Sequence, residues 1–536
     1  MKAVYLIVAL LTFQISSAQD QDAWVFFMDK ENVASSIANP ITILTQEALD
    51  RKELHGIPVD VRDVPITLSY ITEVKNAEGV AVLASSKWMN CLHVRGTEED
   101  LANLLNLGFV DHIEYADQGL NRPIGMMNNQ NKFEDEWLHR IEYIYGSAAN
   151  QIEMISGQFL HQQDFTGEGM IIAVLDAGFP NVATNPAFSN IISENRLLDT
   201  YDFVLRQKDV TGTGSHGVKT FSDIGGFLQD QFVGTAPDAS FYLFRTEYAP
   251  DENPVEESYW VEALERADSL GVDVVNTSLG YQDYDNPNYN HSYTDLDGQT
   301  TFAARGANLA FEKGMLLVTS AGNDGNGFGT VGTPADAPGT LTIGAVDGSG
   351  NYVSFSSSGP TVDGRIKPDV MTQGAASAVV NQNGNVAFNN GTSFSSPIAA
   401  GAVACLWQAF PEHTNEEIMQ AIRESATLFS NPTDQMGYGI PNFESAFNAL
   451  MNVGFDEELL ASGFVIYPNP VFTEIRVSAT TEYETILISM YDVLGKLIHQ
   501  QVVSGQENTI NVESLNAGMY ILVIESNELM ETFRLV

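Results

Sequence analysis

Three short segments of the chain place an acid, a histidine and a serine beside small residues. Asp176 ends the apolar run Ile171–Leu175, His216 precedes Gly217, and Ser393 opens a stretch of small and apolar residues. A serine hydroxyl is a poor nucleophile until a base removes its proton; histidine is the base near neutral pH, and an acid fixes its tautomer. Acid, histidine and serine in this chain order therefore predict acyl transfer.

Each segment also has a purely structural interpretation. Asp176 alone fits a turn or helix cap equally well, and Ser393 alone is better explained as the N-cap region of a buried helix. The other histidines of this part of the chain lie in polar surroundings, and we expect them to be exposed to solvent: His161, His291 and His413. Only the combination of the three segments favours catalysis.

Apolar strands must position these side chains. Near-continuous apolar runs are typical of strands buried on both faces of a parallel sheet, and here they cover 170–175, 272–276, 315–320 and 341–345. Helical stretches at 258–270 and 301–313 lie between them. Residues 146–450 are thus predicted to form a doubly wound α/β domain, in which ligands bind beyond the carboxyl ends of the strands.

Composition limits the possible partners. The chain has 536 residues, 44% of them hydrophobic, and 25 Lys and Arg against 69 Asp and Glu give a net charge of −44. A chain this acidic repels phosphate backbones and anionic membrane surfaces, so we expect no nucleic-acid partner and no stable membrane insertion. The two cysteines, Cys91 and Cys405, are too few for a disulfide framework or a Cys-x-x-Cys zinc site.

The first residues have the pattern of an export signal. Met1-Lys2 precedes an apolar run to Phe13 and the small residues Ser16-Ser17-Ala18. We expect a signal peptide at 1–18, and no later segment is long and apolar enough to cross a membrane.

Two smaller domains are predicted on either side of residues 146–450. Residues 19–145 read as a small α/β domain with a strand at 24–28, a helix at 45–53, a hairpin within 80–94, a helix capped by Thr97 and a strand at 109–113. The polar stretch Asn121 to Asn131 suits an exposed, cleavable linker. An acidic linker at 451–464 leads to 465–536, whose alternating strands predict a small β-sandwich.

The middle domain resembles the subtilisin-like serine peptidases. The resemblance covers roughly 300 residues, most of one domain, and rests on eight ordered motifs: Asp176-Ala177-Gly178, His216-Gly217, Gly234 to Ala239, Asn276 to Gly280, Thr319 to Gly325, Phe355 to Pro360, Lys367 to Val370 and Gly391-Thr392-Ser393. It implies that Ser393 is the nucleophile, His216 the general base and then acid, and Asp176 the orienting carboxylate. Asn323 is implied to form the oxyanion hole with the N–H of Ser393.

The chain departs from the family pattern near each of these residues. Ala177 stands where the family usually has serine or threonine, so one hydrogen bond to Asp176 is expected to be lost. Val218 to Phe221 replaces the usual threonine, polar residue, valine and alanine, and Phe394-Ser395 follows the nucleophile instead of methionine and alanine. No catalytic group is removed, so we expect a divergent but active enzyme.

The resemblance also implies a substrate pocket. Its walls would be the backbones of Ser278-Leu279-Gly280 and Ser320-Ala321-Gly322, with Gly332 at the base. Because no charge lies at that base, large apolar residues are expected before the scissile bond, with broad specificity.

The flanking domains have resemblances of their own. Residues 19–145 resemble the inhibitory propeptides of secreted subtilases, and 465–536 resemble the C-terminal sorting domain of the type IX secretion system. This implies export from a Bacteroidetes-type bacterium, with protein substrates and the secretion machinery as partners. An accessory β-sandwich is the alternative for the last domain.

Two questions stay open at this stage. Calcium is possible because subtilases often bind it, but a solvated loop is the preferred interpretation of the acidic residues Asp283, Asp285, Asp295 and Asp297, and no cofactor is expected to be required. The alternative function is a catalytically silent surface adhesin or scaffold on the same fold.

Overall fold

The computed structural model describes residues 20–121, 143–248, 250–459 and the segments 464–467, 474–479, 485–492, 496–504, 507–512, 515, 520–526 and 530–535. The predicted signal peptide and most of the predicted linker after Asn121 lie outside these residues. The chain divides into two compact units, one ending at Phe447 and one starting at Asn448.

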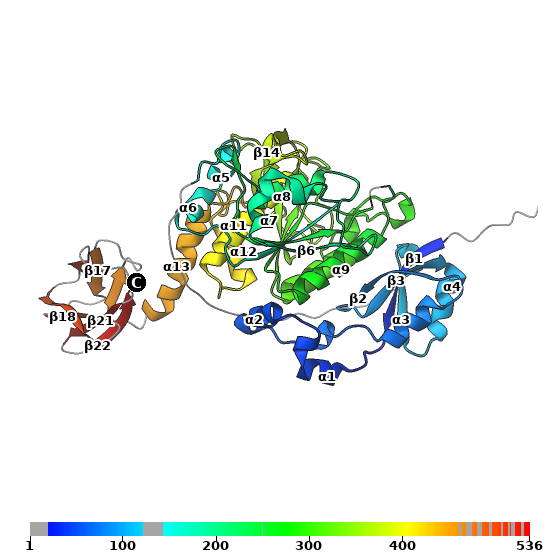
Figure 1. Ribbon diagram of the computed structural model, residues 1–536, viewed down its shortest axis with the longest axis horizontal. Helices are drawn as coiled ribbons and strands as arrows, with labels where there is room; N and C mark the ends of the chain where they lie inside the picture. The colour runs from blue at the N-terminus through cyan, green and yellow to red at the C-terminus, as the bar shows by residue number, and fades with distance from the viewer. Residues whose placement is uncertain are drawn as a thin grey trace, which may run out of the picture. The chain divides into compact units, whose positions relative to one another are not determined.

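A seven-stranded sheet of order β13-β12-β11-β10-β5-β9-β6 forms the centre of the first unit (Figure 1). Every pairing in it is parallel. Its strands are β5 (Ile171–Asp176), β6 (Leu197–Asp202), β9 (Ser240–Arg245), β10 (Val274–Thr277), β11 (Leu316–Ser320), β12 (Thr340–Val346) and β13 (Val370–Gln373). The predicted doubly wound domain is confirmed, because the four apolar runs of the sequence coincide with the inner strands β5, β10, β11 and β12.

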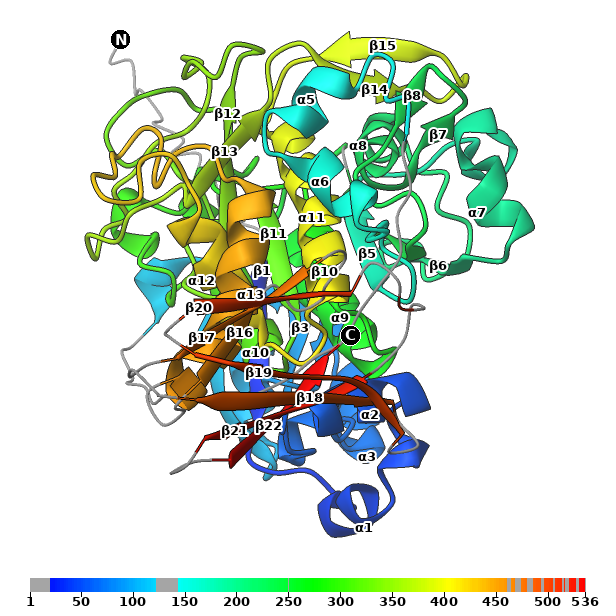
Figure 2. The same ribbon diagram turned by 90° about the vertical axis from the view of Figure 1, so that its left-hand side faces the viewer.

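Helices cover both faces of this sheet (Figure 2). The pair α8 (His216–Gly225) and α11 (Thr392–Ala409) packs on one face, and the pair α9 (Val255–Ser269) and α10 (Phe302–Glu312) packs on the other. The remaining helices and strands are α5 (Ala149–Glu153), α6 (Gly157–Gln162), α7 (Ser189–Ser193), β7 (Phe227–Leu228), β8 (Phe232–Val233), β14 (Ser377–Val380), β15 (Val386–Asn389), α12 (Asn415–Glu424) and α13 (Phe443–Leu459).

The N-terminal domain is a four-stranded antiparallel sheet of order β2-β3-β1-β4 with helices against it. Its elements are β1 (Asp20–Phe27), α1 (Val33–Ala38), α2 (Gln46–Leu54), α3 (Leu68–Lys75), β2 (Ala81–Ser86), β3 (Cys91–Thr97), α4 (Glu98–Asn103) and β4 (Val110–Tyr115). Thr97 caps α4 as predicted, by accepting from the N–H of Asp100 at 3.2 Å. Helix α3 was not predicted; its Thr67 cap makes no side-chain capping bond.

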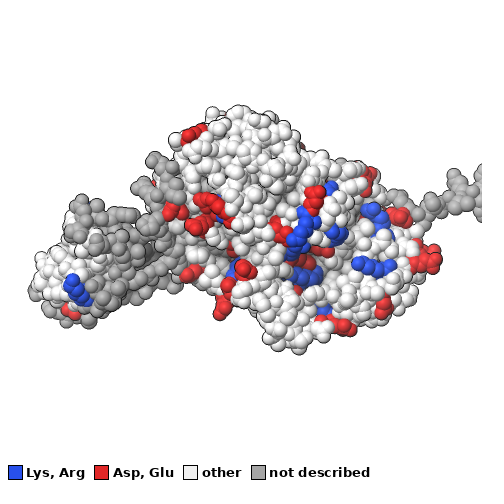
Figure 3. All heavy atoms as spheres, in the orientation of Figure 1, with Lys and Arg blue, Asp and Glu red and all other residues white. Residues whose placement is uncertain are grey.

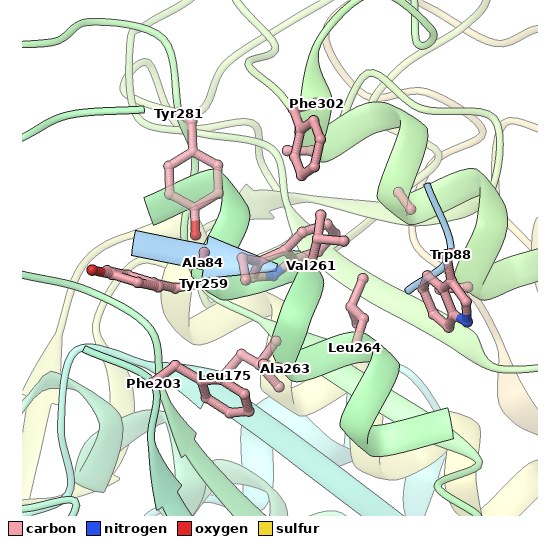
Figure 4. Close-up of a cluster of buried hydrophobic side chains, with 14 of the residues drawn as sticks. Ala84, Trp88, Leu175, Phe203, Tyr259, Val261, Ala263, Leu264, Tyr281 and Phe302 are labelled. Carbon is pink, nitrogen blue, oxygen red and sulfur yellow. The ribbon is translucent and has the colours of Figure 1, made fainter. Parts of the chain in front are cut away.

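The N-terminal domain shares a hydrophobic core with α9 and α10. Figure 4 shows Ala84 and Trp88 of the N-terminal domain beside Val261 and Leu264 of α9. Trp24 stacks on Phe302 with ring centroids 4.7 Å apart, and its indole N–H donates to Ser258 Oγ at 2.8 Å. Charged side chains of both signs gather around this junction (Figure 3).

The second unit contains two antiparallel sheets. One has the order β16-β17-β20, from β16 (Phe464–Tyr467), β17 (Glu474–Ala479) and β20 (Glu507–Asn511). The other has the order β19-β18-β21-β22, from β18 (Ile486–Asp492), β19 (Leu497–Val503), β21 (Tyr520–Ser526) and β22 (Met530–Leu535). Apolar residues of both sheets form one core, as a β-sandwich requires. Among the described residues, no helix is long and apolar enough to cross a membrane.

Candidate active site

The predicted site residues gather at the carboxyl edge of the parallel sheet. Asp176 is the last residue of β5 and pairs with Arg245 at the end of β9. Ser278 and Ala321 follow the ends of β10 and β11, which are the next strands along the sheet. Because parallel strands end at one edge, segments far apart in the sequence meet there.

Asp176 is fully buried and accepts hydrogen bonds from three residues. Oδ1 accepts from the N–H of Ala177 at 2.7 Å and from His216 Nδ1 at 2.8 Å. Oδ2 lies 3.0 Å from His216 Nδ1 and accepts from the Thr220 hydroxyl at 3.0 Å. These donors compensate the carboxylate for the hydrogen bonds to water that burial removes.

His216 is the first residue of α8, and its side chain is 36% exposed. Because Nδ1 faces the carboxylate, its proton lies on Nδ1, and the lone pair of the neutral ring lies on Nε2. The charge of Asp176 raises the pKa of His216 above the ordinary 6.5, against the effect of burial. The ring centroid of Phe394 lies 5.7 Å from that of the His216 imidazole, so this departure from the family pattern packs beside His216.

Ser393 lies in the first turn of α11. The helix follows Gly391, whose backbone φ of 144° is one that residues with a side chain rarely adopt. The Ser393 hydroxyl donates to the carbonyl of Ser278 at 3.4 Å, and the Ser278 hydroxyl donates to the carbonyl of Ser393 at 2.9 Å. The hydrogen bonds of the described residues do not join Ser393 Oγ to His216; bonds of this kind often tighten only with substrate.

Asn323 lies beside this helix start. Its Oδ1 accepts from the N–H of Thr392 at 2.9 Å, which leaves the Nδ2 protons to donate elsewhere. The N–H of Ser393 belongs to the first turn of α11, where N–H groups have no partner within the helix. Both groups can donate to a developing oxyanion, helped by the helix dipole.

The predicted pocket segments lie close to one another. The N–H of Tyr281 donates to the carbonyl of Thr333 at 2.8 Å, which joins the Ser278–Gly280 wall to the segment of Gly332. A Cβ on Gly332 would lie 3.5 Å from Gln282 Oε1, an ordinary contact. Gln282 was missed by sequence reasoning, and its buried Oε1 has no hydrogen-bond partner among the described residues.

Glu247 is a second residue that the sequence did not reveal. It follows β9 closely, and its Oε1 accepts from the hydroxyls of Tyr281 at 2.9 Å and Thr246 at 2.8 Å. Burial raises the pKa of Glu247 to about 7. Its negative charge adds to that of Asp176 in raising the pKa of His216.

The expectation that the other histidines are exposed is wrong. His161 and His413 are buried, and the side chain of His291 is only 9% exposed. His161 contacts the Tyr145 hydroxyl and the Thr235 carbonyl, both at 2.9 Å, and burial lowers its pKa to about 4. The polar sequence around each histidine gave no sign of the distant segments that cover it.

Carboxylates of the acidic loop accept hydrogen bonds from nearby groups of the chain. Asp295 accepts from the N–H of Ser292 at 2.7 Å, Asp297 from the N–H of Thr300 at 2.7 Å, and Asp283 from the Asn290 amide at 2.7 Å. Asp295 and Asp297 therefore cap turns, and Asp283 is held by a side chain seven residues away. Over the described ranges, no group of three or more Asp, Glu, His or Cys side chains is placed to hold a metal ion.

Comparison with known proteins gives three matches to family models. The model of the subtilase family matches residues 167–441, that of the Bacteroidota peptidase S8 propeptide domain matches 22–134, and that of the secretion system C-terminal sorting domain matches 465–536. The first match covers the whole candidate site.

Individual proteins are similar to parts of this chain. Subtilisin E of Bacillus subtilis is 28% identical over 301 residues, which are 55% of this chain and 70% of that protein. The membrane-bound transcription factor site-1 protease of Rattus norvegicus is 31% identical over 261 residues, 47% of this chain and 22% of that protein. The crystal structure of MycP1 from Mycobacterium smegmatis is 22% identical and aligns with a TM-score of 0.44, over 59% of this chain and 89% of that one.

The sorting domain indicates export, either as a secreted protein or to the cell surface. With its propeptide domain, peptidase domain and sorting domain, the chain belongs to the subtilase family and is a serine-type endopeptidase.

Proposed function

We propose that the protein cleaves peptide bonds through an acyl-enzyme formed on Ser393. His216 Nε2 takes the proton of the Ser393 hydroxyl as the oxygen attacks the carbonyl carbon. The same imidazolium then gives the proton to the leaving amine, and a water molecule hydrolyses the ester by the reverse sequence. The observation that supports this proposal most directly is the pair of contacts, 2.8 and 3.0 Å, between His216 Nδ1 and the buried carboxylate of Asp176.

The oxyanion of the tetrahedral intermediate would accept hydrogen bonds from Asn323 Nδ2 and from the N–H of Ser393. The bond from Thr392 N–H to Asn323 Oδ1 supports this role, because it fixes the amide beside the start of α11 and leaves its Nδ2 protons for another acceptor. Donors that are already oriented stabilise the transition state without reorganisation.

Specificity is proposed to be broad, with a large apolar residue before the scissile bond. The pocket would be formed by the Ser278–Gly280 and Ser320–Gly322 backbones around Gly332. Gln282 adds one amide group near the base, so a tyrosine hydroxyl should be tolerated as well as a phenylalanine ring.

The flanking domains are proposed to act before and after catalysis. The propeptide domain would be cut off within about 121–149 by the enzyme itself, and the sorting domain would engage the secretion machinery. Truncation after Asn452 should then give active enzyme in a foreign host and failed secretion in the native one. Loss of activity in a folded truncated protein would contradict this separation.

Ser393→Ala tests the proposal directly, because it removes one hydroxyl group. The variant should fail to hydrolyse casein, fail to react with a fluorophosphonate probe, and accumulate as uncut precursor. Cleavage of casein at the wild-type rate would show that Ser393 is not the nucleophile.

A further inference from the structure

The buried carboxylate of Asp176 receives one hydrogen bond from an unexpected place. Ala177 has no hydroxyl to offer, and only its backbone N–H reaches the carboxylate, at Oδ1. A hydroxyl donor comes instead from Thr220, whose Oγ1 lies 3.0 Å from Asp176 Oδ2. Both residues of this contact are fully buried.

The position of Thr220 on α8 explains the contact. Residues four apart on a helix lie on one face, so Thr220 stands one turn after His216 and faces the same side. Gly217, between them, brings α8 close to β5: a Cβ there would lie 3.0 Å from Cβ of Asp176. The base and the hydroxyl therefore hold the same carboxylate from one helix face.

The hydroxyl of Thr220 has two acceptors but only one proton. Besides Asp176 Oδ2, the carbonyl of Gly217 lies 3.1 Å from Thr220 Oγ1. A helical threonine commonly bonds the carbonyl of the preceding turn, so that contact alone indicates no special role. A carboxylate is the stronger acceptor, because hydrogen bonds to ionised groups are roughly twice as strong as neutral ones.

We propose that Thr220 is a positioning residue for catalysis, which replaces at the fourth residue after His216 the hydroxyl that is missing at Ala177. Its hydrogen bond fixes Oδ2 of Asp176, and so fixes the orientation of the His216 ring. Thr220 touches no substrate, because it is fully buried. This inference rests on the proposed triad.

The hydrogen bond from Thr220 to Asp176 can be removed by substitution, and a hydroxyl donor to Asp176 can then be introduced at Ala177. Thr220→Val keeps the shape of the side chain and removes the hydroxyl; Ala177→Ser places a hydroxyl beside the N–H that already contacts Asp176. Full-length Thr220→Val, Thr220→Ser and Thr220→Val/Ala177→Ser proteins are compared with wild type by peptide hydrolysis and thermal melting, with Ser393→Ala in parallel.

Thr220→Val should lower kcat by about 10- to 100-fold, as expected for a lost hydrogen bond to a charged group, with KM unchanged. Thr220→Ser and the double variant should recover most of kcat. A Thr220→Val enzyme with wild-type kcat would overturn the inference, and so would a folded double variant or Thr220→Ser variant as slow as Thr220→Val. Activity in Ser393→Ala would instead refute the proposed function, independently of Thr220.

Discussion

Lys313 of the peptidase domain and Asp63 of the propeptide domain form an ion pair in which both side chains are buried. Their side chains are 1% and 0% exposed, and Lys313 Nζ lies 2.8 Å from Asp63 Oδ2. A second buried pair crosses the same junction, from Arg51 of the propeptide domain to Asp268 of α9 at 2.6 Å. The segment that carries these propeptide residues, 45–63, therefore packs against the peptidase domain at α9 and at the end of α10.

Glycines of the peptidase domain make room for this segment. A Cβ on Gly271 would lie 2.7 Å from Cβ of Glu47, and one on Gly314 would lie 2.2 Å from the Ile57 side chain. Both glycines also have positive φ, 81° and 86°. The surface of the peptidase domain is thus shaped for its own propeptide at this point.

Breaking the Lys313–Asp63 pair should destabilise the precursor and spare the mature enzyme. Lys313→Met in the Ser393→Ala precursor removes the cation nearest to Asp63 and leaves Lys52, whose Nζ lies 3.6 Å from Asp63 Oδ1. The loss of this charged hydrogen bond should cost about 1.5–3 kcal/mol of unfolding free energy. In the mature enzyme, Lys313 would face water, and the same change should cost less than about 0.5 kcal/mol. Chemical denaturation of both forms measures the difference.

Lys208 provides the matched control for this experiment. It pairs with Asp199 at 2.7 Å, but its side chain is 73% exposed, so the pair is screened by solvent. Lys208→Met should leave both forms nearly unchanged. Equal losses of stability for Lys313→Met in precursor and mature enzyme would contradict the propeptide-specific role of the pair.

Asn323→Ala should slow catalysis without preventing acylation. The variant loses the side-chain donor to the oxyanion and keeps the nucleophile, so kcat should fall by about 10²–10³ with little change in KM. The fluorophosphonate probe should still label Ser393, more slowly than in wild type. An unchanged kcat would remove Asn323 from the oxyanion site.

The pH dependence of kcat/KM should follow the pKa of His216, which the neighbouring charges shift. Only the neutral imidazole accepts the proton of Ser393, so kcat/KM should fall as the pH drops through the pKa of His216, which Asp176 raises above 6.5. Asp176→Asn removes this charge; it should move the acid limb to lower pH and reduce kcat by about 10⁴.

A variant at Lys219 should shift the same limb in the opposite direction. The positive charge of Lys219 lowers the pKa of His216, whereas Glu247 and Asp176 raise it. Lys219→Gln should therefore move the acid limb to higher pH. An acid limb that responds to neither substitution would mean that it reports a group other than His216.

The sequence predicts the site better than it predicts the surroundings of the site. Asp176, His216 and Ser393 are recognisable because each stands at a strand end or a helix start, where local pattern fixes position. The contact of Gln282 with Gly332 depends on the bridge between Tyr281 and Thr333, which joins segments about fifty residues apart and leaves no local pattern.

Thr220 shows the same limit in a different way. The loss of a hydroxyl at Ala177 is visible in the sequence, and the i, i+4 spacing of His216 and Thr220 is visible too. What the sequence does not give is how closely α8 approaches β5, and only this distance turns a helical threonine into a donor to Asp176. Helix α3 was not predicted; its first turn carries no acidic residue, whereas the first turns of α2 and α4 do, and that is a signal visible in the sequence.

Substitution at Gly332 should reshape specificity without unfolding the enzyme. The nearest atom to a new Cβ would be Gln282 Oε1 at 3.5 Å, so the Cβ of Gly332→Val meets no backbone clash. Its methyl groups should instead occupy space proposed for the substrate side chain. Preference for Phe, Leu and Met before the scissile bond should give way to Ala and Gly, because each methylene of fit is worth about 1–3 kcal/mol.

A peptide library scored at this position measures the change, with Gln282→Leu as the companion variant. Gln282→Leu removes the amide near the base and should lower kcat/KM for Tyr relative to Phe, while Gly332→Val lowers both. A strict requirement for Arg or Glu in the wild-type enzyme would contradict an uncharged pocket. So would a Gly332→Val enzyme that still prefers Phe, since the residue at the base of the pocket must limit the size of the side chain that enters.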